Sequence, residues 1–547
     1  MCKVLYKELA TTNKNVNNHP HLSLNMNGET IMSKTNKTAK SALIIIIFTL
    51  GSKFLGFIRE TLIASKFGSG METDAFFVAL TATGLVNTLI MNAISTTFIP
   101  ILSEVEAKEG KEGKINHVNN LINIVLFVSV ILVIVAWFLS PLIVRLTAKG
   151  FEGEQFNLAV TLTRIGLPMI LFSGLIGAFT VFLQSEQRHL SAAAIGFPLN
   201  FAYIIFLLFL STIFGIKGLM VAAIIGIISQ FLIQIPEARI AGFRYIFVFD
   251  IKDEYIKKVL VLSVPVLIGV AINDINVIVD RTLASDLVVG SISALNYANK
   301  LKGLILGVFV SAVTTVIFPL LAKESNSDNI KGMKGIMGYG VNLILLITIP
   351  ATVGLVVLAT PIVQIAFERG AFTLNDTIMT STALVFYSLG LVSASLQLLI
   401  TRVYYSLQDM RTPMLIGGLS VVFNIILNLV LVRYMAHGGL AFATSISSVL
   451  SILLMFYGLK NKIGSLGTKG YITTFIKAGL ASAVMGIVTY VVYNGLYGFL
   501  GVSKLYNLIS LLASVGTGAV VYGVLCYLFR VQEVRDVVQN VKDKIIR

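Results

Sequence analysis

The chain has 547 residues, of which 56% are hydrophobic and only 13% are charged, and its mean hydropathy is +0.86. A soluble protein has about 25% charged residues, so the composition excludes a soluble globular protein and indicates a polytopic membrane protein. The two Cys provide no disulfide framework, and one Trp and five His leave little material for metal or redox chemistry.

Residues 1–40 differ in composition from the rest of the chain. They are rich in Asn, Thr and Lys and contain no apolar run, which predicts a disordered tail. A cleaved signal peptide is not expected, because the apolar segment that follows is long and has no small-residue cleavage site. The sequence leaves Met1, Met26 and Met32 open as the start of translation.

Long apolar segments follow one another along the remainder of the chain. A helix needs about 20 such residues to cross the hydrocarbon core of a bilayer. We therefore expect an all-α polytopic membrane protein of about 14 transmembrane helices. The fourteen segments are 41–65, 73–103, 119–144, 157–183, 190–212, 218–235, 259–285, 291–322, 335–362, 378–405, 413–432, 439–459, 471–494 and 505–529.

The distribution of basic residues predicts the orientation of these helices. With a cytoplasmic N-terminus, the cytoplasmic segments hold 27 Lys and Arg and the opposite loops hold seven. Cytoplasmic loops are enriched in Lys and Arg, so both termini are expected on the cytoplasmic side of the membrane. This asymmetry also explains most of the net charge of +15, and no nucleic-acid partner is needed.

The second half of the chain resembles the first at an offset of about 220 residues. STTFIPILSE (95–104) matches VTTVIFPLLAKE (313–324), with Pro100 over Pro319. Two six-helix lobes related by a parallel repeat enclose a central site that opens alternately to each side. The expected parts are a tail at 1–40, an N-lobe at 41–236, a cytoplasmic linker at 237–258, a C-lobe at 259–460, two C-terminal helices at 461–530 and a cytoplasmic tail at 531–547.

Several ionisable residues lie inside the predicted spans, where they usually face a cavity or a partner. Lys53 and Arg59 lie in the first helix, Asp74 begins the second, and Lys300 lies in the eighth. These repeat-related helices would line the gap between the lobes, and fixed cations there suit an anionic, phosphate-bearing substrate. Asp74 would be a counter-charge, a gate or a switch. The alternative is that Arg59, Glu60 and Asp74 snorkel or pair near the outer interface.

A second group of residues offers only oxygen ligands. Asp280 in the seventh helix is expected near Asn424 and Asn428, one turn apart on the eleventh, and near Thr444 on the twelfth. A carboxylate with amide and hydroxyl oxygens suits a hard cation such as Na⁺. In the alternative interpretation Asp280 pairs with Arg281, and the two Asn join helices.

Two sets of motifs resemble the MviN/MurJ family of the multidrug and oligosaccharidyl-lipid exporter superfamily. GSKFLGFIRE (51–60), FGSGMETDAFFVA (67–79) and FIPILSE (98–104) resemble its N-terminal signature. FERGAFTLNDTIMTSTALVFYSLGL (367–391) and YYSLQDMRTP (404–413) resemble its C-terminal half. The resemblance covers about residues 41–530.

The resemblance implies fourteen helices and export of lipid II, the undecaprenyl-pyrophosphate-linked peptidoglycan precursor, by alternating access. It implies that cavity cations contact the pyrophosphate, that the last two helices form a groove for the lipid tail, and that cell-wall synthesis proteins are partners. Arg59 stands at the family's essential Arg and Asp74 at the family's Asp.

The sequence departs from the family in the cavity. Lys53 and Lys300 stand where Arg is common, and Asn87 and Thr88 stand where the family usually has an Arg pair. The loss of cationic charge leaves another undecaprenyl-pyrophosphate-linked glycan, of the capsule, teichoic or O-antigen type, as an alternative substrate.

Other function classes fit the sequence less well. A drug/cation antiporter of the same superfamily would favour an acidic cavity. A membrane enzyme needs acid–base or nucleophilic groups near a large interfacial loop. No loop between the predicted spans exceeds about 25 residues, and no His lies within a span. No Walker-type loop supports direct ATP coupling. A non-transporting scaffold would tolerate the loss of Arg59.

Overall fold

The computed structural model describes residues 28–188, 190–501 and 503–545. Side chains are described from residue 47 onward, apart from 92, 93, 95, 96, 264–266, 268, 273, 537, 540–542, 544 and 545. The expected disordered tail therefore lies outside the described residues at 1–27. Its remaining part is helical, because α2 begins at Gly28.

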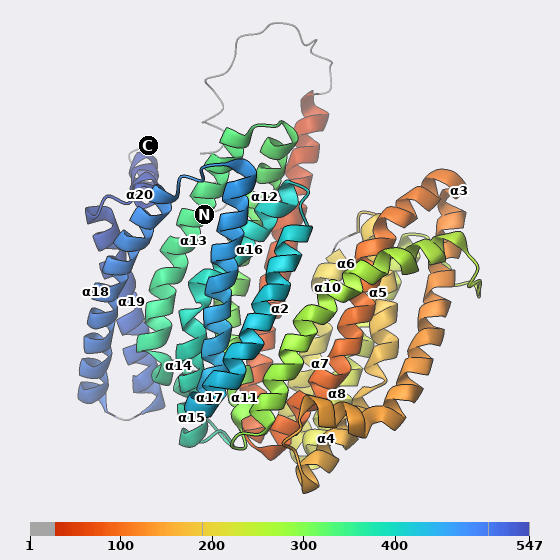
Figure 1. The fold of residues 1–547 in the computed structure, drawn as a ribbon, viewed down its shortest axis with the longest axis horizontal. Helices are drawn as coiled ribbons and strands as arrows, with labels where there is room; N and C mark the ends of the chain where they lie inside the picture. Colours follow the sequence, from red (N-terminus) through yellow and green to blue (C-terminus); the bar gives the residue numbers. More distant parts are fainter. Residues whose placement is uncertain (1–27, 189, 502, 546–547) are drawn as a thin grey trace, which may run out of the picture. The chain divides into compact units, whose positions relative to one another are not determined.

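The described residues form helices joined by short connections (Figure 1). These are α2 (Gly28–Phe67), α3 (Met71–Thr147), α4 (Gly153–Gly166), α5 (Met169–Ser185), α6 (Leu190–Ala194), α7 (Gly196–Phe209), α8 (Ser211–Leu232), α9 (Gln234–Ile240), α10 (Glu254–Ser285), α11 (Ser291–Ile305), the π-helix η1 (Leu306–Val310), α12 (Ser311–Asn326), α13 (Ile330–Val357), α14 (Ala359–Phe367), α15 (Leu374–Leu389), α16 (Leu391–Ser406), α17 (Arg411–Ile463), α18 (Thr468–Leu500), α19 (Lys504–Leu528) and α20 (Gln532–Ile545).

All fourteen predicted apolar segments lie in these helices. By length and composition, ten helices of the described part could cross a membrane, or eleven if the bent pair α15 and α16 forms one span. The number is smaller than fourteen partly because α17 contains two predicted segments and counts once. The segments 41–65 and 259–285 lie in α2 and α10, which are not among those counted. The predicted all-α, multi-span membrane fold is confirmed.

Several helix ends and breaks have clear local causes. Asp253 is the N-cap of α10, where its carboxylate accepts hydrogen bonds from the backbone N–H groups of Tyr255 and Ile256, which would otherwise lack a partner. Gly110 has a φ of 73° and breaks α3 in a conformation that glycine adopts without steric cost. The break thus lies between the predicted spans 73–103 and 119–144, which are both parts of α3.

The chain divides into two compact units, Met1–Ile47 and Phe48–Arg547, and only the second is considered below. Within it, α3 packs against α4, α5 and α10, while α13 packs against α18, and α18 packs against α19. α10 also packs against α17, so it contacts helices from both predicted lobes. The bounds of the lobes remain predictions.

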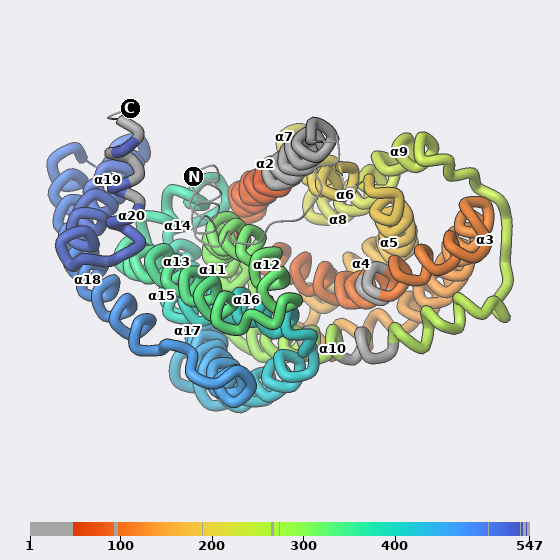
Figure 2. Tube along the Cα trace, turned by 90° about the horizontal axis from the view of Figure 1, so that it is seen from above, coloured from red at the N-terminus to blue at the C-terminus, as the bar shows by residue number. Residues whose placement is uncertain are grey.

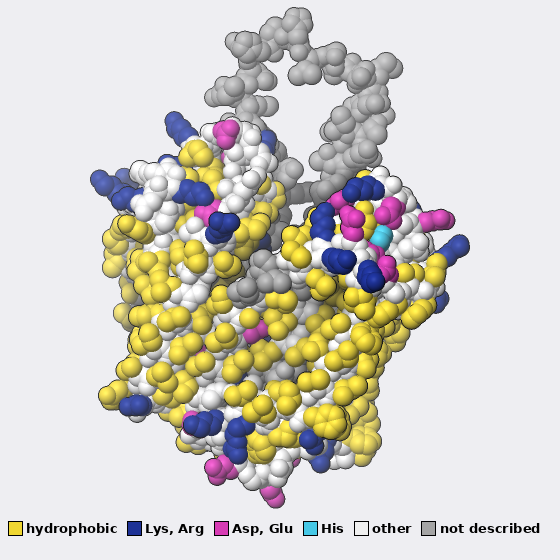
Figure 3. Space-filling view, turned by 45° about the vertical axis from the view of Figure 1, so that its right-hand side comes forward, with side chains coloured by type: hydrophobic (Ala, Val, Ile, Leu, Met, Phe, Trp, Pro, Cys, Tyr) yellow, Lys and Arg dark blue, Asp and Glu magenta, His cyan; other side chains and the backbone are white. Residues whose placement is uncertain are grey.

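Large apolar side chains cover much of the outer surface of this unit (Figure 3). On α3, for example, Phe138 is 76% exposed. A soluble protein rarely exposes apolar patches this extensive, whereas lipid is the natural environment of such a surface.

The connection between α9 and α10 is not helical and passes beside α3 (Figure 2). Three Asn side chains of α3 donate to its backbone: Asn119 to Arg244 O, Asn123 to Val248 O and Asn120 to Asp250 O, each at 2.9 Å. The backbone of the expected linker is thereby fixed to α3.

Candidate functional site

Two of the predicted cavity cations, Arg59 and Lys300, contact the carboxylate of Glu60. Arg59 Nη2 donates to Glu60 Oε1 at 2.8 Å, and Lys300 Nζ lies 3.5 Å from the same oxygen. Glu60 is 3% exposed. A charge removed from water in this way needs a partner, and here a carboxylate on α2 has one cation on its own helix and one on α11. The contact links the two predicted halves of the protein.

The guanidinium of Arg59 is also held by an aromatic ring. Its Cζ lies 4.9 Å from the centroid of the Tyr203 ring on α7, which is the geometry of a cation–π contact. Arg59 Nε has no hydrogen-bond partner among the described residues, nor does Glu60 Oε2. Both atoms therefore remain available to a ligand or water.

A cavity of about 220 Å³ lies beside this pair. Arg59, Glu60, Tyr203 and Asn87 contribute to its lining. Asn87 Oδ1 is buried and also lacks a partner in the described part of the chain. The position at which the sequence differs from the family's usual Arg is thus at the cavity, where it changes both charge and hydrogen bonding.

Lys53 makes a separate contact between α2 and the second half. Its Nζ donates to the carbonyl oxygen of Gly307 at 2.8 Å. Gly307 lies in η1, and π-helical turns frequently occur at functional sites. A Cβ added at Gly307 would lie 2.7 Å from Lys53 Nζ, so glycine permits this close approach. Lys53 and Glu60 both lie on α2, but they have different partners.

Asp74 lies away from these cations and caps the start of α11. Its carboxylate accepts hydrogen bonds from Gly290 N at 2.7 Å, Ser293 N at 2.8 Å and Ser293 Oγ at 2.5 Å. Asp74 is 2% exposed. A carboxylate at a helix N-terminus satisfies free backbone donors and complements the helix dipole.

Two further contacts reinforce this junction. Ser69 Oγ donates to Gly290 O at 3.0 Å, and Tyr297 OH donates to Gly68 O at 3.1 Å. Gly70 and Gly290 are the N-caps of α3 and α11, and they are separated by the offset of the predicted repeat. The starts of two repeat-related helices therefore close against each other at this end of the protein.

The oxygen-rich group is partly assembled. Asn428 Nδ2 donates to Asp280 Oδ1 at 2.6 Å and to Asn424 Oδ1 at 2.8 Å. Thr444 instead donates to Leu440 O on its own helix at 3.1 Å. Asn428 Oδ1 is buried without a partner among the described residues. One carboxylate and two amides with an unused oxygen fit a small hard cation.

Several partners in these contacts are absent from the sequence-based site. Glu60 is the shared partner of Arg59 and Lys300, and the sequence offered its pairing only as the alternative interpretation. Gly290 and Gly307 contribute backbone groups, for which the sequence has no signal, whereas Ser293 contributes both its backbone N–H and its hydroxyl. The structure thus arranges the predicted residues in three groups. They are a charged cluster (Arg59, Glu60 and Lys300), a closing contact (Asp74 with Gly290 and Ser293) and an oxygen cluster (Asp280, Asn424 and Asn428).

Comparison with known proteins identifies the family of the chain. The family model described as "Lipid II flippase MurJ" matches residues 63–509. A probable lipid II flippase MurJ of Vibrio cholerae serotype O1 is 30% identical over 437 residues, which are 78% of this chain and 83% of that protein. The lipid II flippase MurJ of Burkholderia cenocepacia is 28% identical over 457 residues, which are 82% and 89% of the two chains.

Solved structures show the same fold. A lipid II flippase MurJ in an inward closed conformation superposes with a TM-score of 0.75 at 28% identity, covering 91% of this chain and all of that one. An inward-facing multidrug resistance MATE family transporter of the MOP superfamily gives a TM-score of 0.66 at 14% identity, covering 77% and 99%. The second likeness concerns the fold alone. The chain therefore belongs to the lipid II flippase MurJ family.

Proposed function

We propose that the protein moves lipid II from the cytoplasmic to the outer leaflet of the bacterial cell membrane by alternating access. The observation that supports this most is the convergence of Arg59 and Lys300 on Glu60 between the two halves. A pyrophosphate entering here would replace Glu60 as the partner of both cations. Arg offers bidentate geometry to phosphate, and Lys offers a point charge.

The closing contact at Asp74 suggests how access alternates. The carboxylate and the N-terminus of α11 belong to different halves, so they must separate for the cavity to open at that end. In the proposed cycle, substrate bound by Arg59 and Lys300 draws the halves together at one end, and the contacts of Asp74 break at the other. Asp74 therefore acts as a gate and has no direct role in phosphate binding.

The proposed orientation places both termini in the cytoplasm. The segment 237–258, which holds five Lys and Arg, and the turn of α3 near Gly110 belong to the predicted cytoplasmic set. Cytoplasmic loops attract such residues. The end closed by Asp74 then faces the outside, as a gate that prevents back-flow would require.

A second candidate substrate is another undecaprenyl-pyrophosphate-linked glycan. Asn87 favours it, because this residue lines the cavity in place of a common Arg. The pyrophosphate would keep its contacts with Arg59 and Lys300, whereas the sugars would meet an amide. A drug/cation antiporter is less compatible with two cations at one carboxylate.

We further propose that Asp280, Asn424 and Asn428 hold a sodium ion. Thr444, the fourth predicted ligand, would have to give up its hydrogen bond to Leu440 O to join them. A bound Na⁺ would supply a fixed positive charge between α10 and α17. Turning the amide of Asn428 would direct Oδ1 toward that ion and release its hydrogen bond to Asp280.

A depletion experiment tests the proposed substrate. A bacterium is depleted of its own lipid II flippase and expresses this chain or its Arg59→Ala variant, and lipid II reachable from outside the cell is measured. We expect growth and accessible lipid II with the wild type and neither with the variant. A wild type that is inserted in the membrane but fails to rescue growth would exclude lipid II and favour the second candidate.

A further inference from the structure

A second cavity, of about 620 Å³, lies apart from the charged cluster. Side chains of α3, α5, α8 and α9 line it, together with the start of the connection to α10. Its interior is apolar, and three Phe rings form one wall: Phe179 lies 5.3 Å from Phe231 and 5.1 Å from Phe243 between ring centroids. An apolar, preformed cavity of this size suits part of a hydrocarbon chain.

Two arginines are at the rim of this cavity, which we call the aromatic cavity. Arg239 and Arg244 are exposed, and neither has a carboxylate within ion-pair distance in the described part of the chain. Two carboxylates of this region have other partners: Glu186 pairs with Lys114 at 2.6 Å and Glu237 with Arg188 at 4.0 Å. The rim therefore has positive charge that the protein itself does not neutralise.

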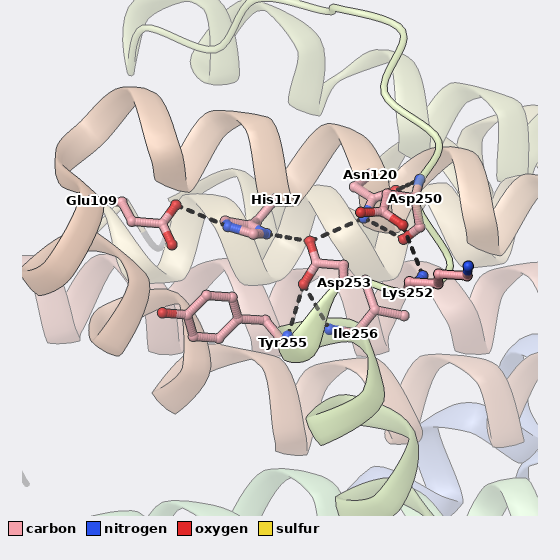
Figure 4. A network of polar contacts seen from close by, with 8 residues as sticks. All are labelled: Glu109, His117, Asn120, Asp250, Lys252, Asp253, Tyr255 and Ile256. Carbon is pink, nitrogen blue, oxygen red and sulfur yellow. Dashed lines mark hydrogen bonds and ion pairs between the residues drawn. The ribbon is translucent and has the colours of Figure 1, made fainter.

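The connection that forms part of the rim has an unusual surface. Tyr245 is 60% exposed, Phe247 is 73% exposed and Ile251 is 55% exposed. Four backbone atoms of this connection are bonded to Asn side chains of α3, two of them at Asp250, which Asn120 contacts in Figure 4. Exposed aromatic side chains next to basic ones are typical of the membrane interface.

A compact polar network keeps this connection in place. His117 Nδ1 lies 2.6 Å from Asp253 Oδ2, and Asp253 in turn caps α10 (Figure 4). The opposite ring nitrogen lies 3.0 Å from Glu109. The connection is thus anchored to α3 at both ends: Tyr245 OH donates to Asn123 Oδ1 at 2.8 Å beside the cavity, and Phe247 and Ile251 remain exposed.

We propose that the aromatic cavity binds an anionic phospholipid of the adjoining leaflet, which is the inner leaflet in the proposed orientation. The phosphate contacts Arg239 and Arg244, and one acyl chain lies along Phe179, Phe231 and Phe243. Arg is suited to phosphate because its guanidinium donates in a fork. Basic side chains close to a membrane surface also attract anionic lipids over zwitterionic ones.

The test uses the full-length protein in detergent, titrated with phosphatidylglycerol or phosphatidylcholine and observed by native mass spectrometry. We expect preferential binding of phosphatidylglycerol to the wild type. The double variant Arg239→Gln/Arg244→Gln should lose affinity by about fivefold for each arginine. The matched control is Lys252→Gln/Lys257→Gln, which removes one exposed cation of the same connection and one of α10, neither of which lines the cavity.

Inorganic phosphate and glycerophosphoglycerol, which have the anionic group without acyl chains, are added as competitors. Neither should displace phosphatidylglycerol, because the acyl chain contributes to binding. Displacement by either would overturn the lipid assignment and indicate a free anion site. Equal affinity in the arginine double variant and the wild type, or an equal loss in the lysine control, would overturn the site. Transport is not measured, so these outcomes are independent of the proposed substrate.

Discussion

Asp74 on α3 and Ser293 on α11 are joined by two hydrogen bonds to one carboxylate oxygen, from Ser293 N at 2.8 Å and from Ser293 Oγ at 2.5 Å. The residues are far apart in sequence and belong to different predicted lobes. This contact, with that of Gly290, closes one end of the protein. Both carboxylate oxygens of Asp74 accept hydrogen bonds in this contact, which leads to the first prediction.

Asp74→Asn should open that end more often. The amide has one acceptor oxygen and no charge, and a hydrogen bond to a charged group contributes about 2 kcal/mol. Thr83 is buried and lines the smaller cavity, so a Thr83→Cys probe should react faster with a membrane-impermeant thiol reagent in the Asn variant. Cys2 and Cys526 are replaced first in every protein compared, so that the probe is the only thiol.

Glu72→Gln is the control for this experiment. Glu72 is an exposed carboxylate in the same first turn of α3, and it has no ion pair within the described residues. Labelling should remain at the wild-type rate. Equal labelling of all three proteins would mean that Asp74 does not determine closure.

Glu60→Gln should destabilise the folded protein. It leaves Arg59 and Lys300 without their common carboxylate, and loss of one partner of a buried pair costs about 3 kcal/mol. Lys300 is 44% exposed, so most of the effect is attributed to Arg59. Thermal unfolding in detergent measures the change, and Glu60→Asp should retain more stability. A Gln variant that unfolds at the wild-type temperature would show that the cluster is not a stabilising ion pair.

Lys53 should tolerate arginine but not glutamate. Lys53→Arg keeps a donor for Gly307 O, whereas Lys53→Glu removes the donor and places an anion beside a carbonyl oxygen and an anionic substrate. Complementation of growth distinguishes the two variants. If they support growth equally, Lys53 has no role beyond lying at the interface.

The Gly307→Ala variant tests the same contact from the other side. The added methyl group would lie 2.7 Å from Lys53 Nζ, so the lysine must move and its hydrogen bond to Gly307 O must break. We expect activity between that of Lys53→Arg and Lys53→Glu. Full activity would show that this hydrogen bond has no part in transport.

Asp280→Asn should remove any stabilisation of the protein by sodium. The variant replaces the only carboxylate that contacts Asn428 in the described structure, and Na⁺ binding to the folded state raises its stability by mass action. The melting temperature is measured in sodium and in potassium chloride at equal ionic strength. A wild type that melts at the same temperature in both salts would exclude the sodium site.

The fold was largely predictable because apolar segments of sufficient length leave few alternatives to membrane helices. Lys53, Arg59 and Lys300 were also identifiable, because charge inside such segments is rare. The partners were harder to predict. Gly290 and Gly307 contribute only backbone atoms. The pair of Arg59 and Glu60 was foreseen only in the alternative interpretation, because adjacent residues lie on different parts of a helix surface.

The second cavity could not be predicted at all from the sequence. Phe179, Phe231 and Phe243 come from three elements, and in a chain this apolar their side chains are indistinguishable by type from lipid-facing ones. The contacts of Asn119, Asn120 and Asn123 could not be predicted either, because their acceptors are backbone carbonyls of the connection between α9 and α10. Such contacts depend on tertiary placement alone.

The most direct test of the account is translocation of lipid II by the purified protein in liposomes. Fluorescent lipid II is incorporated, and the fraction reached by an impermeant quencher is followed over time for the wild type, Arg59→Ala and Arg164→Ala. Arg164 contacts Ser140 and the Trp137 ring away from the charged cluster. The account predicts translocation by the wild type and Arg164→Ala, and only the protein-free rate for Arg59→Ala. Wild-type translocation by Arg59→Ala would contradict it.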